Sequence, residues 1–154
     1  MERKKIIGIS LVVALILLIV IIQFFVLKPA KPYIPKPDFK DGDEVQIQHI
    51  DWLSNELGAY QLSPDAEMEM IVAEKVFTVK VVDKRPMSSL GNATDPDIRI
   101  RGDYPSFVQI FSSTDIMTEV SKLYKEGKVQ VELVKDLGTL VLKGYKGIYD
   151  NIQG

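Results

Sequence analysis

SKLYKEGKVQVELV, residues 121–134, places the end of a helix directly before a strand. Leu123 and Tyr124 continue an apolar helix face, and Gly127 is the residue type that commonly ends a helix. The following residues alternate as in a half-buried strand, with Val129, Val131 and Leu133 on one face. We expect this helix to lead into a final antiparallel hairpin, whose second strand is TLVLKGY, residues 139–145.

Two amphipathic helices are predicted before that hairpin. Asp103 can cap the first helix, with Pro105 in its first turn, and Ser113 or Thr114 opens the second. Their apolar residues recur at helical spacing: Phe107, Ile110 and Phe111 in the first, and Ile116, Met117, Val120, Leu123 and Tyr124 in the second. Each helix therefore has one face directed at a core.

The remaining elements of the same domain, residues 41–154, lie before these helices. We predict a helix over 43–57 capped by Asp43, strands over 68–74, 76–82 and 98–101, and a loop over 85–96. The order is helix, three strands, two helices, two strands. It predicts an α+β fold, a largely antiparallel five-stranded sheet with helices packed on it.

DPDIRIRGDYPSFVQIFSSTDIMTEVSKLYKEGKVQVELVKDLGTLVL, residues 95–142, resembles the sterol carrier protein type 2 lipid-binding domain family. The likeness lies in a D-x-x-I-x-I strand, two amphipathic helices and an E-G-K-V-x-V strand. It implies a hydrophobic cavity between sheet and helices that holds a fatty acyl chain, a sterol or a similar lipid. The wall of that cavity would be the eight apolar helix residues named above. Ordinary core, which a small domain needs, explains the same residues better than a ligand wall does.

An apolar segment precedes the domain. IIGISLVVALILLIVIIQFFVL, residues 6–27, has no charge, and eighteen of its twenty-two residues are Ile, Leu, Val or Phe. As a helix it would be about 33 Å long, enough to cross a hydrocarbon core of about 30 Å. We predict one transmembrane helix after a short basic tail, residues 1–5. A cleaved signal peptide is the alternative, but its apolar region would be shorter.

KPAKPYIPKPDFK, residues 28–40, joins the two parts and has four prolines between lysines. It predicts a semi-rigid, polyproline-like spacer that holds the domain away from the bilayer; a proline-rich ligand is the alternative. Lysines and arginines on both sides of the span leave orientation nearly balanced. We expect a single-pass protein with a cytoplasmic amino terminus and an extracytoplasmic domain. The sequon at Asn92 suits glycosylation on that side.

Composition excludes several classes of function. The net charge is −2 and the sequence pI about 5.5, without basic clusters interleaved with aromatics, which argues against nucleic-acid binding. The chain has no cysteine, one histidine and no glycine-rich phosphate loop. We therefore expect no catalytic residues, no metal and no cofactor. His49 is expected at the surface or at a boundary.

Several polar and aromatic residues allow two interpretations. Asp95, Asp97 and Asp103 could gather as a cation site, but turn and cap roles explain them better. The acidic residues of 65–69 are expected to form a solvated face. Arg101-Gly102-Asp103 spells an adhesion tripeptide that a turn and a helix cap also explain. Trp52 is expected to pack the first helix onto the domain, with a membrane-facing role as the alternative.

These observations lead to two hypotheses. The first is a membrane-anchored, non-catalytic domain that binds an apolar ligand, a lipid or fatty acyl chain. The alternative is an anchored protein-interaction or assembly module with the same fold and a filled core. A continuous interior cavity of about 300 Å³ or more favours the first, whereas a packed interior with an exposed apolar patch favours the second.

Overall fold

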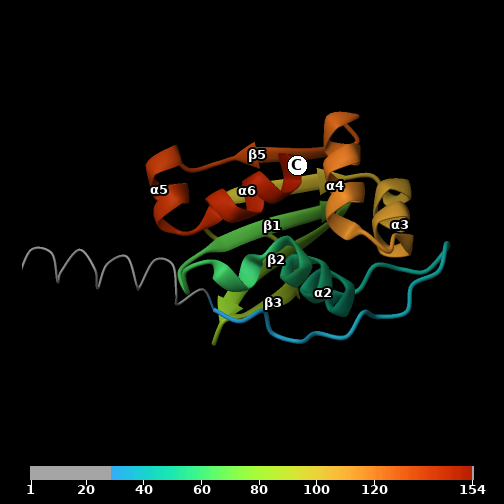
Figure 1. Cartoon of the computed structure of the whole chain (residues 1–154), viewed down its shortest axis with the longest axis horizontal. Helices are drawn as coiled ribbons and strands as arrows, with labels where there is room; N and C mark the ends of the chain where they lie inside the picture. The colour runs from blue at the N-terminus through green and yellow to red at the C-terminus, as the bar shows by residue number, and fades with distance from the viewer. Residues whose placement is uncertain (1–28, 154) are drawn as a thin grey trace, which may run out of the picture. The chain divides into compact units, whose positions relative to one another are not determined.

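The computed structural model describes residues 29–153, which form one five-stranded sheet with helices on one of its faces (Figure 1). The elements in chain order are α2 (Ile47–Leu57), the 3₁₀ helix η1 (Ala59–Gln61), β1 (Glu67–Val72), β2 (Lys75–Val82), β3 (Arg85–Leu90), β4 (Ile98–Gly102), α3 (Tyr104–Ser112), α4 (Ile116–Lys125), β5 (Val129–Leu133), α5 (Leu137–Leu142) and α6 (Tyr145–Gln153). The predicted α+β class is confirmed, and the sheet has five strands as predicted, but β3 takes the place of the strand expected over 139–145.

The strands lie in the order β3-β2-β1-β4-β5. Three neighbouring pairs are antiparallel, whereas β1 and β4 are parallel. The sheet is therefore mixed, and largely antiparallel as expected. In the register, Met70 of β1 lies between Phe77 of β2 and Ile100 of β4, and all three are buried. This alternation sets the face of the sheet that the helices cover.

The opposite face of the sheet is polar and carries a crossing loop. Arg99 Nε contacts a Glu69 carboxylate oxygen at 2.6 Å, and its Nη1 contacts Glu132 at 3.2 Å. The other Glu69 oxygen accepts the N–H of Ala93 at 2.9 Å, which ties the loop 91–96 over β1. Glu69 is therefore buried, and the expected solvated face of 65–69 is wrong at this residue, because the loop 91–96 crosses over β1 and covers it.

β3 corrects the expected loop over residues 85–96. Pro86 lacks an N–H, which is tolerated because β3 is an edge strand. On the same outer edge, the N–H of Ser88 donates to Asp51 of α2 at 2.6 Å. The N–H groups on the outer edge of β3 are thus partly paired within the domain. The strand was not predicted because proline argues against a strand.

The carboxy-terminal region differs most from the prediction. Residues 139–145, expected as a strand, lie in α5 and in the turn to α6, so no final hairpin forms and β5 is an edge strand. Asp136 caps α5 by accepting the N–H of Thr139 at 3.1 Å. Gly144, at φ 91°, separates the two helices where a Cβ would lie 3.1 Å from the carbonyl oxygen of Gln61. The local helix cap and this close packing override the strand-like alternation.

The other helices largely follow the sequence, with shifted starts. α2 begins at Ile47 because Gln46 and His49 form a reciprocal cap, while the Asp43 carboxylate accepts the N–H of Lys40 at 2.8 Å. Asp103 caps α3 as predicted, whereas Asp115 caps α4 in place of the two preceding residues.

Residues 31–40, called the strap below, form the part of the predicted spacer that packs on the domain. The strap has no helix or strand, as its prolines predict. Lys31 Nζ lies 2.7 Å from the Glu56 carboxylate, and the Asn55 amide donates to the Pro32 carbonyl at 3.0 Å. An extended backbone leaves its carbonyls unpaired, and α2 supplies donors for them. This part of the chain is therefore not a free spacer.

An aromatic cluster holds the end of the strap. Phe39 lies 4.7 Å from Phe111 and 5.1 Å from the His49 ring, measured between centroids. His49 is buried at 4% exposure, and its Nε2 lies 3.1 Å from the Asp38 carbonyl, so its predicted surface position is wrong. Trp52 is buried 5.9 Å from Phe111, which confirms its packing role. The strap thus buries His49, which was expected at the surface or at a boundary.

The predicted membrane span, residues 6–27, and the basic tail lie outside the described residues. Within residues 29–153, no helix has both the length and the apolar character needed to cross a bilayer.

Candidate functional site

The eight residues predicted to line a lipid cavity lie on α3 and α4. Six are buried at 0–8% exposure in one continuous core: Phe107, Ile110, Phe111, Ile116, Val120 and Leu123. Met117 and Tyr124 are partly buried at the border of that core. The buried positions of the sheet belong to the same cluster. The six residues therefore have the packing of a core, and a role in holding a ligand stays a prediction.

Gly102 shows how closely this core is packed. A Cβ at this position would lie 3.0 Å from Cε2 of Phe107 and 3.5 Å from the carbonyl oxygen of Lys128. Gly102 is the last residue of β4, and its φ is not positive. Close approach of an aromatic ring therefore accounts for this glycine of the tripeptide 101–103, in place of the expected turn.

An open groove of about 600 Å³ lies on the outer side of α4, beside α6. Its lining consists of Met117, Thr118, Ser121, Lys122, Lys125, Glu126 and Asn151. Ser121 Oγ donates to the carbonyl of Gln153 at 3.2 Å, which joins the two helices at this place. Of the predicted cavity residues, only Met117 lines this groove. The lysine stems and the thioether offer apolar contact, and the ammonium groups lie at its border.

A second open groove, of about 660 Å³, lies between the residues that follow the strap and the β1–β2 turn. The Tyr104 hydroxyl donates to the Asp43 carbonyl at 2.9 Å and accepts the Gly42 N–H at 2.8 Å. Lys75 and Glu44, which both line the groove, form an ion pair. These contacts satisfy several of the polar groups of this groove within the chain.

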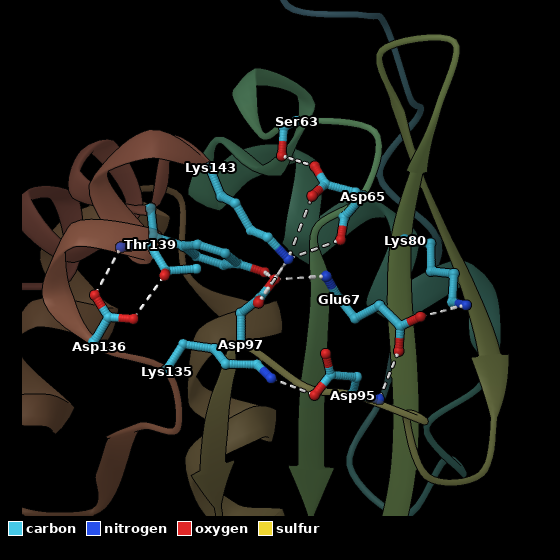
Figure 2. Close-up of polar contacts among 11 residues, drawn as sticks. Ser63, Asp65, Glu67, Lys80, Asp95, Asp97, Lys135, Asp136, Thr139 and Lys143 are labelled. Carbon is cyan, nitrogen blue, oxygen red and sulfur yellow. Dashed lines mark hydrogen bonds and ion pairs between the residues drawn. The ribbon is translucent and has the colours of Figure 1, made fainter.

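Asp97 is the centre of a buried polar cluster where β1, β4 and the α5–α6 junction meet (Figure 2). Its carboxylate accepts from Lys143 Nζ at 2.9 and 3.2 Å, from the Tyr145 hydroxyl at 3.1 Å and from the Glu67 N–H at 2.9 Å. Its own N–H donates to the Glu67 carbonyl at 2.7 Å, and its carbonyl accepts from the N–H groups of 134–135. All the polar groups of this residue have partners.

The electrostatics of the cluster keep its donors protonated. Burial raises the pKa of the Tyr145 hydroxyl above its ordinary value, and the negative charge of Asp97 raises it further. The hydrogen bond to Asp97 raises the pKa of Lys143, whose ammonium also donates to the Asp65 carbonyl at 3.0 Å. The Asp97 carboxylate is thus held by three donors from three parts of the chain: the Glu67 N–H, the Lys143 ammonium and the Tyr145 hydroxyl. The geometry is that of a structural tie between the carboxy-terminal helices and the sheet.

Sequence reasoning assigned Asp97 to a turn or a cation site and missed this role. Its partners Lys143 and Tyr145 lie 46 and 48 residues away, so no local pattern connects them. The other two aspartates act separately: Asp103 caps α3, and Asp95 is exposed and paired with Lys135. Among residues 29–153, no group of three metal-ligating side chains is gathered.

α5 exposes a group of apolar side chains, called the α5 patch below. It consists of Leu133, Val134, Leu137, Val141 and Leu142, which are 40%, 39%, 69%, 57% and 87% exposed. Only Leu140 of this helix is buried in the core. The sequence assigned most of these residues to strands and did not predict a patch. The cap Asp136-x-x-Thr139, which matches Asp115-x-x-Thr118 of α4, is the signal that could have revealed the helix.

Asn92 of the predicted sequon is exposed in the loop 91–96. The Thr78 hydroxyl donates to the Gly91 carbonyl at 2.8 Å, beside the asparagine. The side chain is therefore accessible, and its glycosylation stays a prediction.

No protein-family model matches the sequence, and no curated protein matches it. Among solved structures, the chain is similar to the UbiJ-SCP2 ubiquinone synthesis protein, with a TM-score of 0.41 and 12% identity over 66% of this chain and 90% of that one. It is also similar to palmitated sterol carrier protein 2-like 2 from Aedes aegypti, with a TM-score of 0.36 and 21% identity over 65% and 90%. A double mutant of the sec-alkylsulfatase PisA1 has a TM-score of 0.43 and 13% identity over 70% of this chain and 16% of the enzyme.

Two of these structures have sterol carrier protein names, as does the family that residues 95–142 resemble. The likeness is distant and concerns the fold alone. It assigns neither a ligand nor a reaction to this chain.

Proposed function

We propose that this chain is a membrane-anchored, non-catalytic domain that binds an apolar ligand, a lipid or fatty acyl chain, in the open α4 groove. The observation that carries the proposal is the groove of about 600 Å³ around Met117, which lies in the size range of small-molecule sites. Its place on the surface differs from the interior cavity expected from sequence. An acyl chain would lie along Met117 and the lysine stems.

Polar groups at the border of the groove favour a ligand with an anionic head. Lys122 pairs with Glu119 at 3.1 Å but remains about half exposed, and Lys125 lies one turn further along α4. The one carboxylate of the lining, Glu126, is paired with Lys128 at 2.8 Å. Ammonium groups beside an apolar lining match a carboxylate or phosphate joined to a hydrocarbon chain. A fatty acid is the simplest such molecule.

Photo-crosslinking tests this proposal. The full-length chain in phosphatidylcholine vesicles is irradiated with a fatty acid that carries a diazirine, and adducts are mapped by peptide mass spectrometry. We expect adducts in residues 117–126, reduced at least about threefold by Met117→Glu, which places a charge in the apolar lining. The matched control is Met87→Glu, because Met87 is 56% exposed on β3 and outside the groove. Adducts confined to residues 6–27 would refute the binding site.

A second function, that of an anchored assembly module, is favoured by the filled core. Six predicted cavity residues are buried together, and the chain carries an exposed apolar patch. Such a module would yield no fatty-acid adduct on α4. Instead, amine-reactive crosslinking of the full-length chain would capture discrete oligomers that dilution into excess lipid does not remove.

The membrane orientation is part of the same proposal, with the amino terminus cytoplasmic and the domain outside. The apolar segment 6–27 and its flanking charges support it. Protease added to intact cells should digest the domain and leave the tail. Complete protection of the domain would show the opposite orientation.

A further inference from the structure

We propose that the α5 patch docks on the bilayer that holds residues 6–27, so that the domain lies against the membrane. This contact depends on the proposed anchoring of that segment, and it adds a second, peripheral contact to it. It also reverses the expectation that a spacer holds the domain away from the lipid.

The first observation is the concentration of exposed apolar side chains. Leu137, Val141 and Leu142 lie within one helix of six residues, and the end of β5 adds Leu133 and Val134. Single exposed apolar residues are ordinary on protein surfaces, but a contiguous group marks a contact surface. Leu137 and Val141 are four residues apart and so share one face of α5, which favours a partner that accepts apolar side chains.

The second observation is that the patch has a fixed position. Asp136 caps α5 at its start, and Lys143 follows its last residue and bonds to the buried Asp97 (Figure 2). Lys135, just before the cap, pairs with Asp95. Both ends of the helix are thus bound to residues that directly precede β4, so its exposed face has a defined position on the domain.

The third observation is where the strap begins. Lys31 is bound to Glu56, near the carboxyl end of α2. The chain then passes through η1 to Ser63, whose N–H donates to the Lys143 carbonyl at 3.0 Å, directly after α5. The first residues of the strap and α5 therefore lie at the same end of the domain (Figure 1).

The short connection between the apolar segment and the strap favours the lipid bilayer as the partner of the patch. Between Leu27, the last residue of the apolar segment, and Lys31 there are three residues, 28–30. Fully extended, four residue steps span at most about 14 Å. The headgroup zone of one leaflet is itself roughly 5–8 Å thick. With the strap packed on α2, the short connection keeps this end of the domain within reach of the membrane surface, so that the patch at the same end can enter the interface.

The absence of cysteine allows a direct measurement on the full-length chain. Single cysteines are introduced by Leu142→Cys in the patch, Glu74→Cys in the β1–β2 turn and Ala14→Cys in the apolar segment. Each is labelled with bimane in vesicles of phosphatidylcholine and phosphatidylglycerol that contain nitroxide lipids. Glu74 is the matched control, because it is exposed and follows β1 at the opposite end of the sheet from α5.

We expect shallow nitroxides to quench the label at 142 at least about threefold more than the label at 74. Leu137→Glu, at a position 69% exposed and so tolerant of charge, should abolish that difference. Quenching at 14 without quenching at 142 would overturn the docking and leave the anchor intact. Quenching at neither position would overturn the anchor itself. A label at 142 that iodide cannot reach and lipid does not quench would show a protein contact, which also overturns the proposal.

Discussion

α4 and α5 have the same kind of amino-terminal cap but differ in how far their apolar side chains are buried. In α4, Asp115 accepts the N–H of Thr118 at 3.1 Å and its hydroxyl at 2.7 Å; in α5, Asp136 accepts the N–H of Thr139 at 3.1 Å and its hydroxyl at 2.6 Å. Yet α4 buries Ile116, Val120 and Leu123, whereas α5 buries only Leu140.

The difference teaches that a cap starts a helix and does not decide what the helix covers. α4 is packed against α3, α6 and β5, which bring apolar residues from distant parts of the chain to its inner face. α5 follows the edge strand β5 and is held by the packing of Leu140 in the core and, at its end, by the bond of Lys143 to Asp97. One helix stabilises the core; the other presents apolar side chains outward.

The largest effect is expected when the polar contact that holds the end of α5, the bond between Lys143 and Asp97, is removed. Asp97→Ala should lower the free energy of unfolding by about 3–5 kcal/mol, because the buried Tyr145 hydroxyl loses its acceptor and the partly buried Lys143 ammonium loses its nearest carboxylate and keeps only Asp65. Urea unfolding of the full-length chain in detergent micelles, followed by the fluorescence of Trp52, measures it. The control Asp95→Ala removes an exposed carboxylate and should leave the midpoint unchanged. A loss below about 1 kcal/mol would show that α5 and α6 are held by apolar packing instead.

A matched pair of leucines sharpens the contrast in burial. Leu123 of α4 is 0% exposed and Leu142 of α5 is 87% exposed. Leu123→Ala should cost about 2–5 kcal/mol through lost burial and a cavity, whereas Leu142→Ala should cost less than about 0.5 kcal/mol. The same urea titration measures both. Equal costs would mean that the patch is covered within the protein.

Alkaline pH should weaken the polar contacts of Lys143 and Tyr145 with Asp97 and so lower the stability of the fold. Tyr145 and Lys143 have raised pKa values in the folded chain, so they keep protons that the unfolded chain releases near pH 10. The folded state then binds more protons, and stability falls as the pH rises above about 10. Tyr145→Phe should cost about 1–2 kcal/mol at pH 7 and flatten this decline. Thermal unfolding followed by circular dichroism between pH 7 and 11 tests it, with Tyr149→Phe as control.

The smallest effect should be the titration of the two caps. The hydroxyl of Thr118 lowers the pKa of Asp115, and that of Thr139 lowers the pKa of Asp136. Their stabilisation is present above the unfolded pKa near 4 and is lost as the pH falls through the folded pKa. Thr118→Val should raise only the first pKa and Thr139→Val only the second, as measured by NMR titration of the carboxyls. An unchanged Asp136 would mean that the α5 cap does not form in solution.

The parts of the fold that sequence analysis identified have local causes. Alternation marked β1, β2, β4 and β5, and caps with helical spacing marked α3 and α4. β3 was missed because Pro86 argues against a strand, and proline is tolerated only where the outer edge needs no donor. α5 was missed because Leu140 and Leu142 alternate with polar or exposed positions, as a strand would. Of the candidate site, only Met117 was named in advance, since the groove depends on how α6 lies beside α4.

By itself, the sequence determined that residues 6–27 are long and apolar enough to cross a bilayer, that α3 and α4 are amphipathic, and that the strap is extended. These properties depend on composition, period and proline geometry over short distances. Only the tertiary structure decided that His49 is buried and that Asp97 bonds to Lys143, which lies 46 residues further along the chain. It also decided that the apolar face of α5 stays exposed. Burial depends on which distant segments of the chain pack together, and a local sequence pattern does not specify that packing.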